Sequence, residues 1–186
     1  MYLMEGGDLF VIIALIFCIS VGIILVISGL FKLFGLKVAS ESIIAMDVIP
    51  AKIAKPMSLA FPFIELLIGG GLIFVSESMI VNIMAIILIL IFVLINFQAV
   101  VEKRQKPCFC FGKMIETKIG FGGMVQSLLL LISILVNVIF NNINLIIILD
   151  QGTQVVHVVL IVTVSIFLTV TLILIRIIIE SILTIN

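Results

Sequence analysis

The sequence predicts an all-α integral membrane protein, built as a four-helix transmembrane bundle with a peripheral fifth transmembrane helix. Three observations support this fold class: the composition, five long uncharged stretches, and a one-sided distribution of charge. Of the 186 residues, 64% are hydrophobic and 11% are charged, and the mean hydropathy is +1.55. A soluble domain is about half apolar and about a quarter charged. A chain this poor in charge cannot cover itself with polar surface, so a soluble globular fold is excluded and the lipid bilayer is its expected solvent.

Five stretches are long enough to cross the bilayer, which takes about 20 apolar residues in a helix. The predicted spans are 9–31, 57–76, 79–101, 119–140 and 153–176, and we group them in a single polytopic membrane domain over 1–186. Only Glu65 interrupts the second span with a charge. Asparagines at 141, 142 and 144 should end the fourth helix near Phe140 and leave 145–149 at the interface. Between the first two spans, apolar and charged residues alternate in a way that favours an interfacial helix starting near Ser40 or Ser42 and stopped by Pro50.

With five alternating spans, every basic residue falls on one side of the membrane. These residues are Lys32, Lys37, Lys52, Lys55, Lys103, Arg104, Lys106, Lys113, Lys118 and Arg176. The opposite side carries only the acidic Glu5, Asp8, Glu77 and Asp150. The positive-inside rule therefore predicts a plasma-membrane protein with its N-terminus outside and its C-terminus in the cytoplasm. Ten basic and ten acidic residues give a net charge of zero, which argues against a nucleic-acid partner.

Transmembrane helices associate through small and polar residues, and four of the spans carry such residues on one face. The first has Cys18, Gly22, Leu25 and Gly29; the second Ser58, Pro62, Glu65 and Gly69; the third Asn82, Ala85, Phe92, Asn96 and Ala99; the fourth Gly123, Gln126, Ser133 and Asn137. The three glycines from Gly69 to Gly71 should serve close helix packing, since no phosphate-loop pattern surrounds them. In the fifth span, Ser and Thr show no marked stripe, so we place it at the periphery.

A Cys-x-Cys pair, Cys108 and Cys110, follows the third span on the basic side. Such a pair can close a small, strained and easily reduced ring if the backbone bends, which suits thiol-disulfide exchange. Lys and Arg neighbours favour the thiolate, the attacking species, while Phe109 and Phe111 are expected to hold the loop against the membrane. Acylation of juxtamembrane cysteines and inert buried thiols are the alternatives. A metal site is not expected, because no third ligand is near and His157 lies toward the opposite face.

Glu65 lies well inside the second span, one turn after Pro62. An ionisable residue at this depth is costly and is by default a functional hypothesis, here a proton donor or acceptor for a thiol or quinone step. The structural alternative is a hydrogen bond to Asn96, to Gln126 or to a backbone carbonyl freed by Pro62. Cys18, which shares a face with two glycines, is expected to pack rather than to relay electrons. His157 is expected to form an interfacial hydrogen bond.

Several segments together resemble the MauE family, the methylamine utilisation proteins related to the DoxX/DoxD membrane proteins. They are Ser28-Gly29-Leu30-Phe31-Lys32, Ile49-Pro50, Phe61-Pro62-Phe63-Ile64-Glu65-Leu66 and Pro107-Cys108-Phe109-Cys110-Phe111-Gly112, followed by a glycine-led fourth span. The resemblance covers about Gly22 to Ser133. It implies a bacterial four-helix core with an added helix, and matches Cys108 and Cys110 to the family's Cys-x-Cys-Phe-Gly and Pro62 and Glu65 to its Pro-x-x-Glu. Phe109 stands where the family usually has glycine.

The resemblance also implies a role in redox conditioning or maturation of an exported, disulfide-containing protein. In the methylamine system this partner is the small subunit of methylamine dehydrogenase, handled together with the thioredoxin-like protein MauD. The leading hypothesis is therefore a thiol-disulfide protein in which Cys108 and Cys110 cycle and Glu65 assists proton movement. Because a cytoplasmic pair meets a reducing pool, a quinone or a partner must supply the step across the membrane. The alternatives are a non-catalytic membrane assembly or chaperone protein, and a small proton-coupled transporter that uses Glu65.

Overall fold

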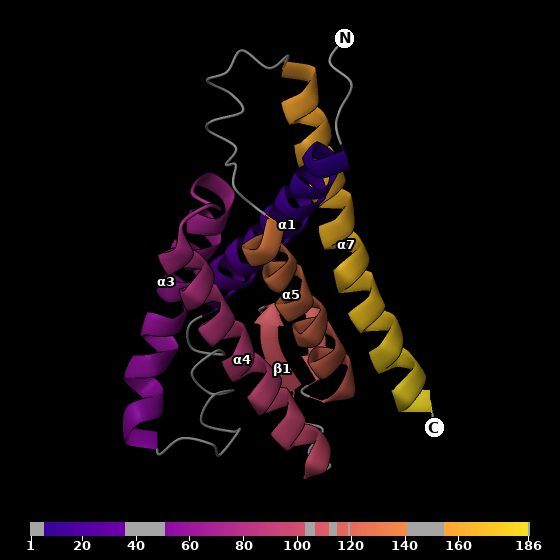
Figure 1. Ribbon diagram of the computed structural model, residues 1–186. Helices are drawn as coiled ribbons and strands as arrows, with labels where there is room; N and C mark the ends of the chain where they lie inside the picture. Colours follow the sequence, from indigo (N-terminus) through magenta and orange to yellow (C-terminus); the bar gives the residue numbers. More distant parts are fainter. Residues whose placement is uncertain are drawn as a thin grey trace.

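Long helices and one β-hairpin form the described part of the chain in the computed structural model (Figure 1). The structure describes residues 6–35, 51–102, 107–111, 115–118, 120–140 and 155–185. The helices are α1 (Gly6–Phe34), α3 (Ala51–Phe74), α4 (Met79–Val101), α5 (Phe121–Phe140) and α7 (Val155–Ile185), and the strands are β1 (Pro107–Phe111) and β2 (Ile115–Lys118). The expected interfacial helix before Pro50 and the interfacial segment 145–149 lie outside the described residues.

A helix lies at each of the five predicted spans, and the all-α membrane class is confirmed. Within the described residues, four helices are long and apolar enough to cross a membrane: α1, α4, α5 and α7. In α3 the strongly apolar part is the shorter run Leu59–Phe74. α5 ends at Phe140 as expected, whereas α7 continues nine residues beyond the predicted end at 176. The start of α1 and the end of α7 lie at opposite ends of the bundle, as five crossings require (Figure 1).

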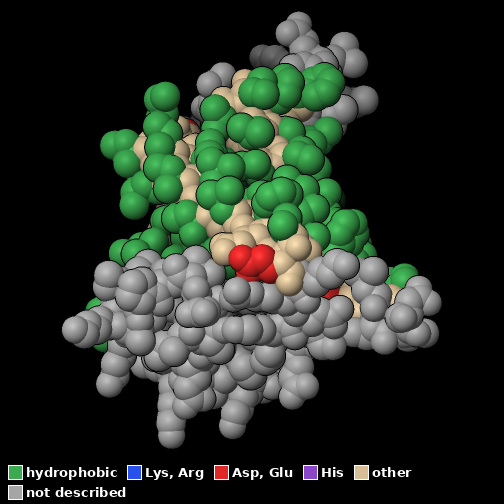
Figure 2. Space-filling model, turned by 90° about the horizontal axis from the view of Figure 1, so that it is seen from below, with side chains coloured by type: hydrophobic (Ala, Val, Ile, Leu, Met, Phe, Trp, Pro, Cys, Tyr) green, Lys and Arg blue, Asp and Glu red, His purple; other side chains and the backbone are tan. Residues whose placement is uncertain are grey.

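Helix α1 is the centre of the bundle and packs against α3, α5 and α7. Half of its most apolar window is buried, compared with 22% in α4 and in α7. Its side chains Cys18, Val21 and Leu25 meet Leu72 of α3 and Ile134 of α5 in the main hydrophobic cluster. Outward-facing side chains are also apolar, and an end-on view shows hydrophobic groups over most of the described surface (Figure 2). This surface is suited to contact with lipid rather than water.

Glycines bring α1 and α3 into close contact. A Cβ atom added to Gly22 would lie 2.8 Å from the carbonyl oxygen of Gly69, and one added to Gly29 would lie 2.8 Å from that of Pro62. Such an approach of two backbones is possible only where the side chain is absent. The predicted faces of the first two spans thus lie in helix contacts, and the structure shows that these two faces meet each other. The predicted faces of α4 and α5 also turn inward, since Asn82, Ala85, Gln126, Ser133 and Asn137 are buried.

The expectation that the last helix has no polar stripe is wrong. Its buried residues recur every three or four positions along one face: Ile161, Ser165, Thr169, Leu172 and Arg176. Ser20 of α1 donates a hydrogen bond to the carbonyl oxygen of Ser165 (3.1 Å), and Thr169 donates to that of Ser20 (3.3 Å). The sequence does not reveal this stripe, because hydroxyl residues also occur on the exposed face. Thr163 and Thr171 are examples, and each donates to a carbonyl oxygen of its own helix.

The segment containing the cysteine pair forms a hairpin, whereas the sequence predicts a loop there. Strand β1 pairs antiparallel with β2, with Pro107 opposite Lys118, Cys108 opposite Thr117 and Phe111 opposite Ile115. The register shifts by one residue between Cys108 and Phe111. β1 contacts α1 and β2 contacts α7, so the hairpin is held at the end of the bundle where α4 ends and α5 begins (Figure 1).

Candidate functional site

Glu65 forms a buried ion pair with Lys32 of α1. Its side chain has no exposed surface, while that of Lys32 is 12% exposed, and the Lys32 ammonium group donates to Glu65 Oε1. Ser28, one turn before Lys32, donates to the other carboxylate oxygen at 3.3 Å. Both partners come from the helix that the glycine contacts bring close, since a Cβ on Gly29 would also lie 3.3 Å from Glu65 Cβ. The carboxylate is thus bound through both oxygens to a single neighbouring helix.

These contacts correct the partners proposed from the sequence. Asn96 donates to the carbonyl oxygen of Phe92 (2.8 Å) and Gln126 accepts from Arg176, so neither of them bonds Glu65. The sequence predicts Lys32 in the loop after the first span, because a charged residue is expected to end a span. In the structure α1 continues to Phe34, and the flexible side chain of Lys32 extends back along the bundle. A salt bridge inside the hydrocarbon region lowers the cost of both charges.

Two aromatic rings complete the surroundings of the ammonium group. Lys32 Nζ lies 5.3 Å from the ring centroid of Phe61 on α3 and 5.3 Å from that of Phe92 on α4. The two rings are in edge-to-face contact, with centroids 5.6 Å apart. Cation-π attraction of this kind stabilises an ammonium group that has little access to water. Lys32 thereby joins α1, α3 and α4 at the hairpin end of the bundle.

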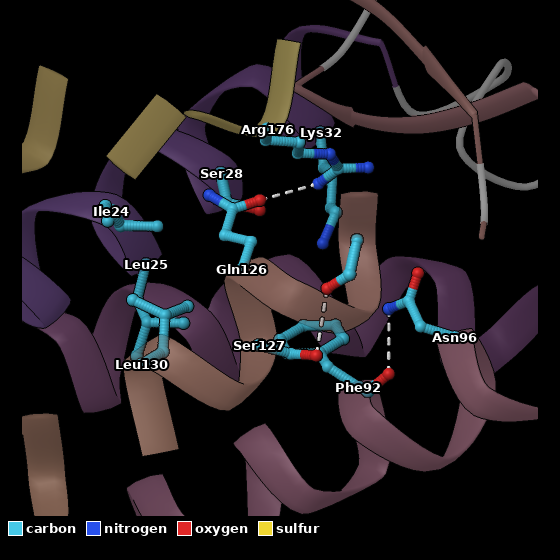
Figure 3. A pocket seen from close by; sticks show the side chains of 11 residues that line it. Ile24, Leu25, Ser28, Lys32, Phe92, Asn96, Gln126, Ser127, Leu130 and Arg176 are labelled. Atoms are coloured by element: carbon cyan, nitrogen blue, oxygen red, sulfur yellow. Dashed lines mark hydrogen bonds between the residues drawn. The ribbon is translucent and has the colours of Figure 1, made fainter. Parts of the chain in front are cut away.

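A small cavity lies on the other side of Lys32, between α1, α4, α5 and α7 (Figure 3). Its polar lining residues are Ser28, Lys32, Asn96, Gln126, Ser127 and Arg176, and its apolar ones are Ile24, Leu25, Phe92 and Leu130, with Gly123 at the base of α5. The volume of about 50 Å³ holds about three to five water molecules at roughly 10–15 Å³ each. The ammonium group of Lys32 points into this space (Figure 3).

Gln126 has a fixed orientation and one unsatisfied donor at this cavity. Arg176 Nη1 donates to Gln126 Oε1 at 2.9 Å, while Arg176 Nε donates to Glu180 at 2.9 Å (Figure 3 shows the first of these bonds). Gln126 is 4% exposed, and its Nε2 group is buried without a hydrogen-bond partner. A buried amide donor left unpaired costs about 1–3 kcal/mol. The cavity therefore presents an N–H group that needs an acceptor.

Cys108 and Cys110 lie on β1, at the same end of the bundle as this cavity. Thr117, which faces Cys108 in the hairpin, precedes the cavity residue Gly123 by six positions, so their backbones are at most about 22 Å apart. Cys18 lies 14 residues before Lys32, about 21 Å along the helix axis. Its buried thiol donates to the carbonyl oxygen of Leu72 at 3.5 Å, which agrees with the packing role expected for it.

A second polar cluster lies at the opposite end of the bundle. Asn137 of α5 donates to Asn82 of α4 (2.8 Å) and to the carbonyl oxygen of Ser76 (3.2 Å) in the turn between α3 and α4. Asn82 also donates to Ser76 (2.8 Å), while Asn137 Oδ1 is buried without a partner. Both asparagines lie on the inward faces that the sequence predicts, whereas their pairing is not predicted by it. This cluster joins α4, α5 and the turn between α3 and α4.

The fold and this site define a multi-pass membrane protein with a buried Lys-Glu pair, a polar cavity and a Cys-x-Cys hairpin at one end. The model of the family described as methylamine utilisation protein MauE matches residues 11–150. The chain therefore belongs to the MauE family of membrane proteins associated with methylamine utilisation. The match covers all predicted site residues, the cysteine pair and Glu65 included. Comparisons with curated proteins and with solved structures give no match.

Proposed function

We propose that this MauE-family protein carries out thiol-disulfide exchange through Cys108 and Cys110 in the maturation of an exported, disulfide-containing protein. One observation above all supports this: the register of the hairpin shifts between Cys108 and Phe111, where the two cysteines lie. In a regular strand, residues two apart are separated by about 6.6 Å, close to the upper limit of the Cα separation of a disulfide. An irregular strand at this point eases the bend that a Cys-x-Cys ring needs.

The reaction is an exchange of two electrons between dithiols and disulfides. A thiolate of the partner attacks a sulfur of the Cys108–Cys110 disulfide, which forms a mixed disulfide and releases one of the two cysteines as a thiolate. The second partner thiolate then attacks the mixed bond, which closes the partner's disulfide and leaves Cys108 and Cys110 as a dithiol. A thioredoxin-like protein of the MauD type is the proposed exchange partner. The basic residues around the pair in the sequence, Arg104 and Lys113 among them, favour the cysteine thiolate that leaves in these steps.

The proposed role of Glu65 is to assist proton movement at the same end of the bundle. Its carboxylate contacts Lys32, and Lys32 lines the cavity, so a proton leaving the cavity reaches the carboxylate through one side chain. Replacement by glutamine keeps hydrogen-bonding capacity and removes the charge. If Glu65→Gln slows thiol exchange while the fold is kept, the proton role is supported. Loss of proton-dependent solute uptake in this variant would instead favour a transporter.

Trapping of the thiol state in cells tests the proposed exchange. Acid quenching followed by alkylation in a Cys18→Ala background should show that Cys108 and Cys110 are partly oxidised, and Cys110→Ser should accumulate a mixed disulfide. Cys108→Ser/Cys110→Ser should abolish maturation of the exported partner. A double variant that matures its partner normally would refute the proposal and favour a non-catalytic assembly protein. Cys18→Ala alone is the matched control and should retain activity, because that thiol is buried far from the hairpin.

The proposed orientation places the hairpin in the cytoplasm and the N-terminus outside. A membrane-impermeant maleimide, applied to intact cells after mild reduction, should leave both cysteines unlabelled. It should label them after lysis and reduction. Labelling in intact cells would invert the orientation and would allow direct exchange with an exported protein. The expected result instead requires an electron acceptor that reaches the pair from within the bilayer or from the cytoplasm.

A further inference from the structure

We propose that the cavity between α1, α4, α5 and α7 binds the carbonyl head of a membrane-soluble quinone. Among its polar lining groups, the buried one without a hydrogen-bond partner is a donor. Gln126 Nε2 is buried and unpaired, and its direction is fixed because Oε1 is held by Arg176 at 2.9 Å. Lys32 Nζ, with three N–H groups, points into the same space (Figure 3). A ligand for this cavity must therefore supply acceptor atoms.

Charge around the cavity favours a neutral acceptor over an anion. Two cations, Lys32 and Arg176, line it, and each is paired with a carboxylate, Glu65 and Glu180. The four charges cancel, so an anionic ligand would have to compete with carboxylates that are already in place. A carbonyl oxygen accepts hydrogen bonds without adding a charge to a site of low dielectric constant. This argues against a phosphate or carboxylate ligand.

The remaining lining favours an aromatic, lipophilic molecule. Ile24, Leu25 and Leu130 supply apolar surface, and Phe92 supplies a ring face. The cavity volume of about 50 Å³ fits the carbonyl edge of a ring, and the rest of the molecule would extend out through the opening of the cavity. Ligand sites of this kind combine mostly apolar lining with a few fixed polar groups. The site lies within a bundle whose outer surface is suited to lipid, so the ligand is expected to arrive through the membrane.

Bound quinone would accept the electrons of the cysteine pair, and this second part rests on the proposed function. The thiols of Cys108 and Cys110 would lose two electrons and two protons and form a disulfide. The quinone would gain both electrons and both protons and become the hydroquinone. The two electrons and two protons that the thiols lose equal those that the quinone gains, so no further oxidant is needed. This reaction would supply the acceptor that a cytoplasmic hairpin requires.

Binding is tested on the Cys108→Ser/Cys110→Ser chain in detergent, so that the result does not depend on the thiols. Decylubiquinone should bind saturably and one to one above the uptake of empty micelles. Gln126→Glu keeps an acceptor for Arg176 but replaces the unpaired donor, and should weaken binding at least tenfold; Gln126→Leu should do the same. Asn137→Leu is the matched control, because it removes an equally buried amide of α5 at the opposite end, and should bind as the parent does.

Several outcomes would overturn the site. They are unsaturable uptake, equal loss in the Gln126 and Asn137 variants, and displacement by decylbenzene or dioleoylglycerol. Displacement by inorganic phosphate or decanoate would show an anion site instead. A second measurement separates the two proposals: the reduced wild-type chain, without oxygen, should convert one quinone per disulfide formed. Binding without this conversion would refute the electron transfer alone. Redox-active cysteines in cells without quinone binding would refute the site and leave the exchange function standing.

Discussion

Breaking the Lys32–Glu65 pair from one side should destabilise the protein much more than removing both partners. Lys32→Met leaves the fully buried Glu65 without its counter-charge, which typically costs about 3–5 kcal/mol. Glu65→Leu leaves a lysine that is 12% exposed and can turn toward water, so its cost should be smaller, about 1–3 kcal/mol. Replacing a buried pair by apolar residues is often neutral, so the double variant should lie within about 1 kcal/mol of the wild type.

The free energy of unfolding in mixed micelles is measured by titration with SDS for the wild type, the two single variants and the double variant, which together form a double-mutant cycle. The two single costs add to at least about 4 kcal/mol, so the coupling between the sites should be at least about 3 kcal/mol. Glu102→Gln is the control, because Glu102 is exposed at the end of α4, and it should change stability by less than about 0.5 kcal/mol. Additive effects within about 0.5 kcal/mol would show that the two residues do not act as a pair and would refute the reasoning.

Three further predictions concern packing, and the same unfolding assay measures them. Gly22→Ala should cost about 1–3 kcal/mol because its Cβ would lie 2.8 Å from a carbonyl oxygen of α3, whereas Gly70→Ala, with open space around it, should be nearly neutral; equal effects would contradict the close contact. Thr169→Val should cost about 0.6 kcal/mol more than Thr171→Val, since only Thr169 bonds a second helix, and no difference would discount the polar stripe of α7. Gly123→Ala should shrink the cavity and cost less stability than Gly22→Ala, because the new methyl group would displace the end of the Asn96 side chain and not a backbone oxygen; a loss as large as that of Gly22→Ala would contradict this packing.

Features that depend on local pattern were predictable from the sequence. The spans follow from runs without charge, and the inward faces follow from small and polar residues at helical spacing. Gly22 and Gly29 lie on a face that the sequence predicts to meet another helix, and the structure shows that this helix is α3. Glu65 was identified because a single carboxylate in an apolar stretch has no local explanation. In each case, the signal lies within a single segment of the sequence: a run without charge, a helical spacing or an isolated charge.

Features that depend on distant partners were not predictable in the same way. The partner of Glu65 is 33 residues away and was assigned to a loop, because a lysine side chain can return several ångströms along its helix. The hairpin depends on pairing between two short strands, which no hydrophobic period indicates. Residues from four helices line the cavity, so no single segment of the sequence indicates it. Gln126 Nε2 can be identified as the unpaired donor only because the structure shows Arg176 bound to Gln126 Oε1. Tertiary contacts decided all three.

The central position of α1 sets the order in which the protein can mature during synthesis. α1 is made first, yet its bonds to α7 join residues 145 and 149 positions apart. At about 5–20 residues per second, roughly 7–30 s pass before Ser20 can meet Ser165. The ion pair of Lys32 with Glu65 can form sooner, after about 2–7 s, because Glu65 is made only 33 residues later. The earliest helix thus enters the membrane before its bonds to the other helices can form, and the last helix completes them.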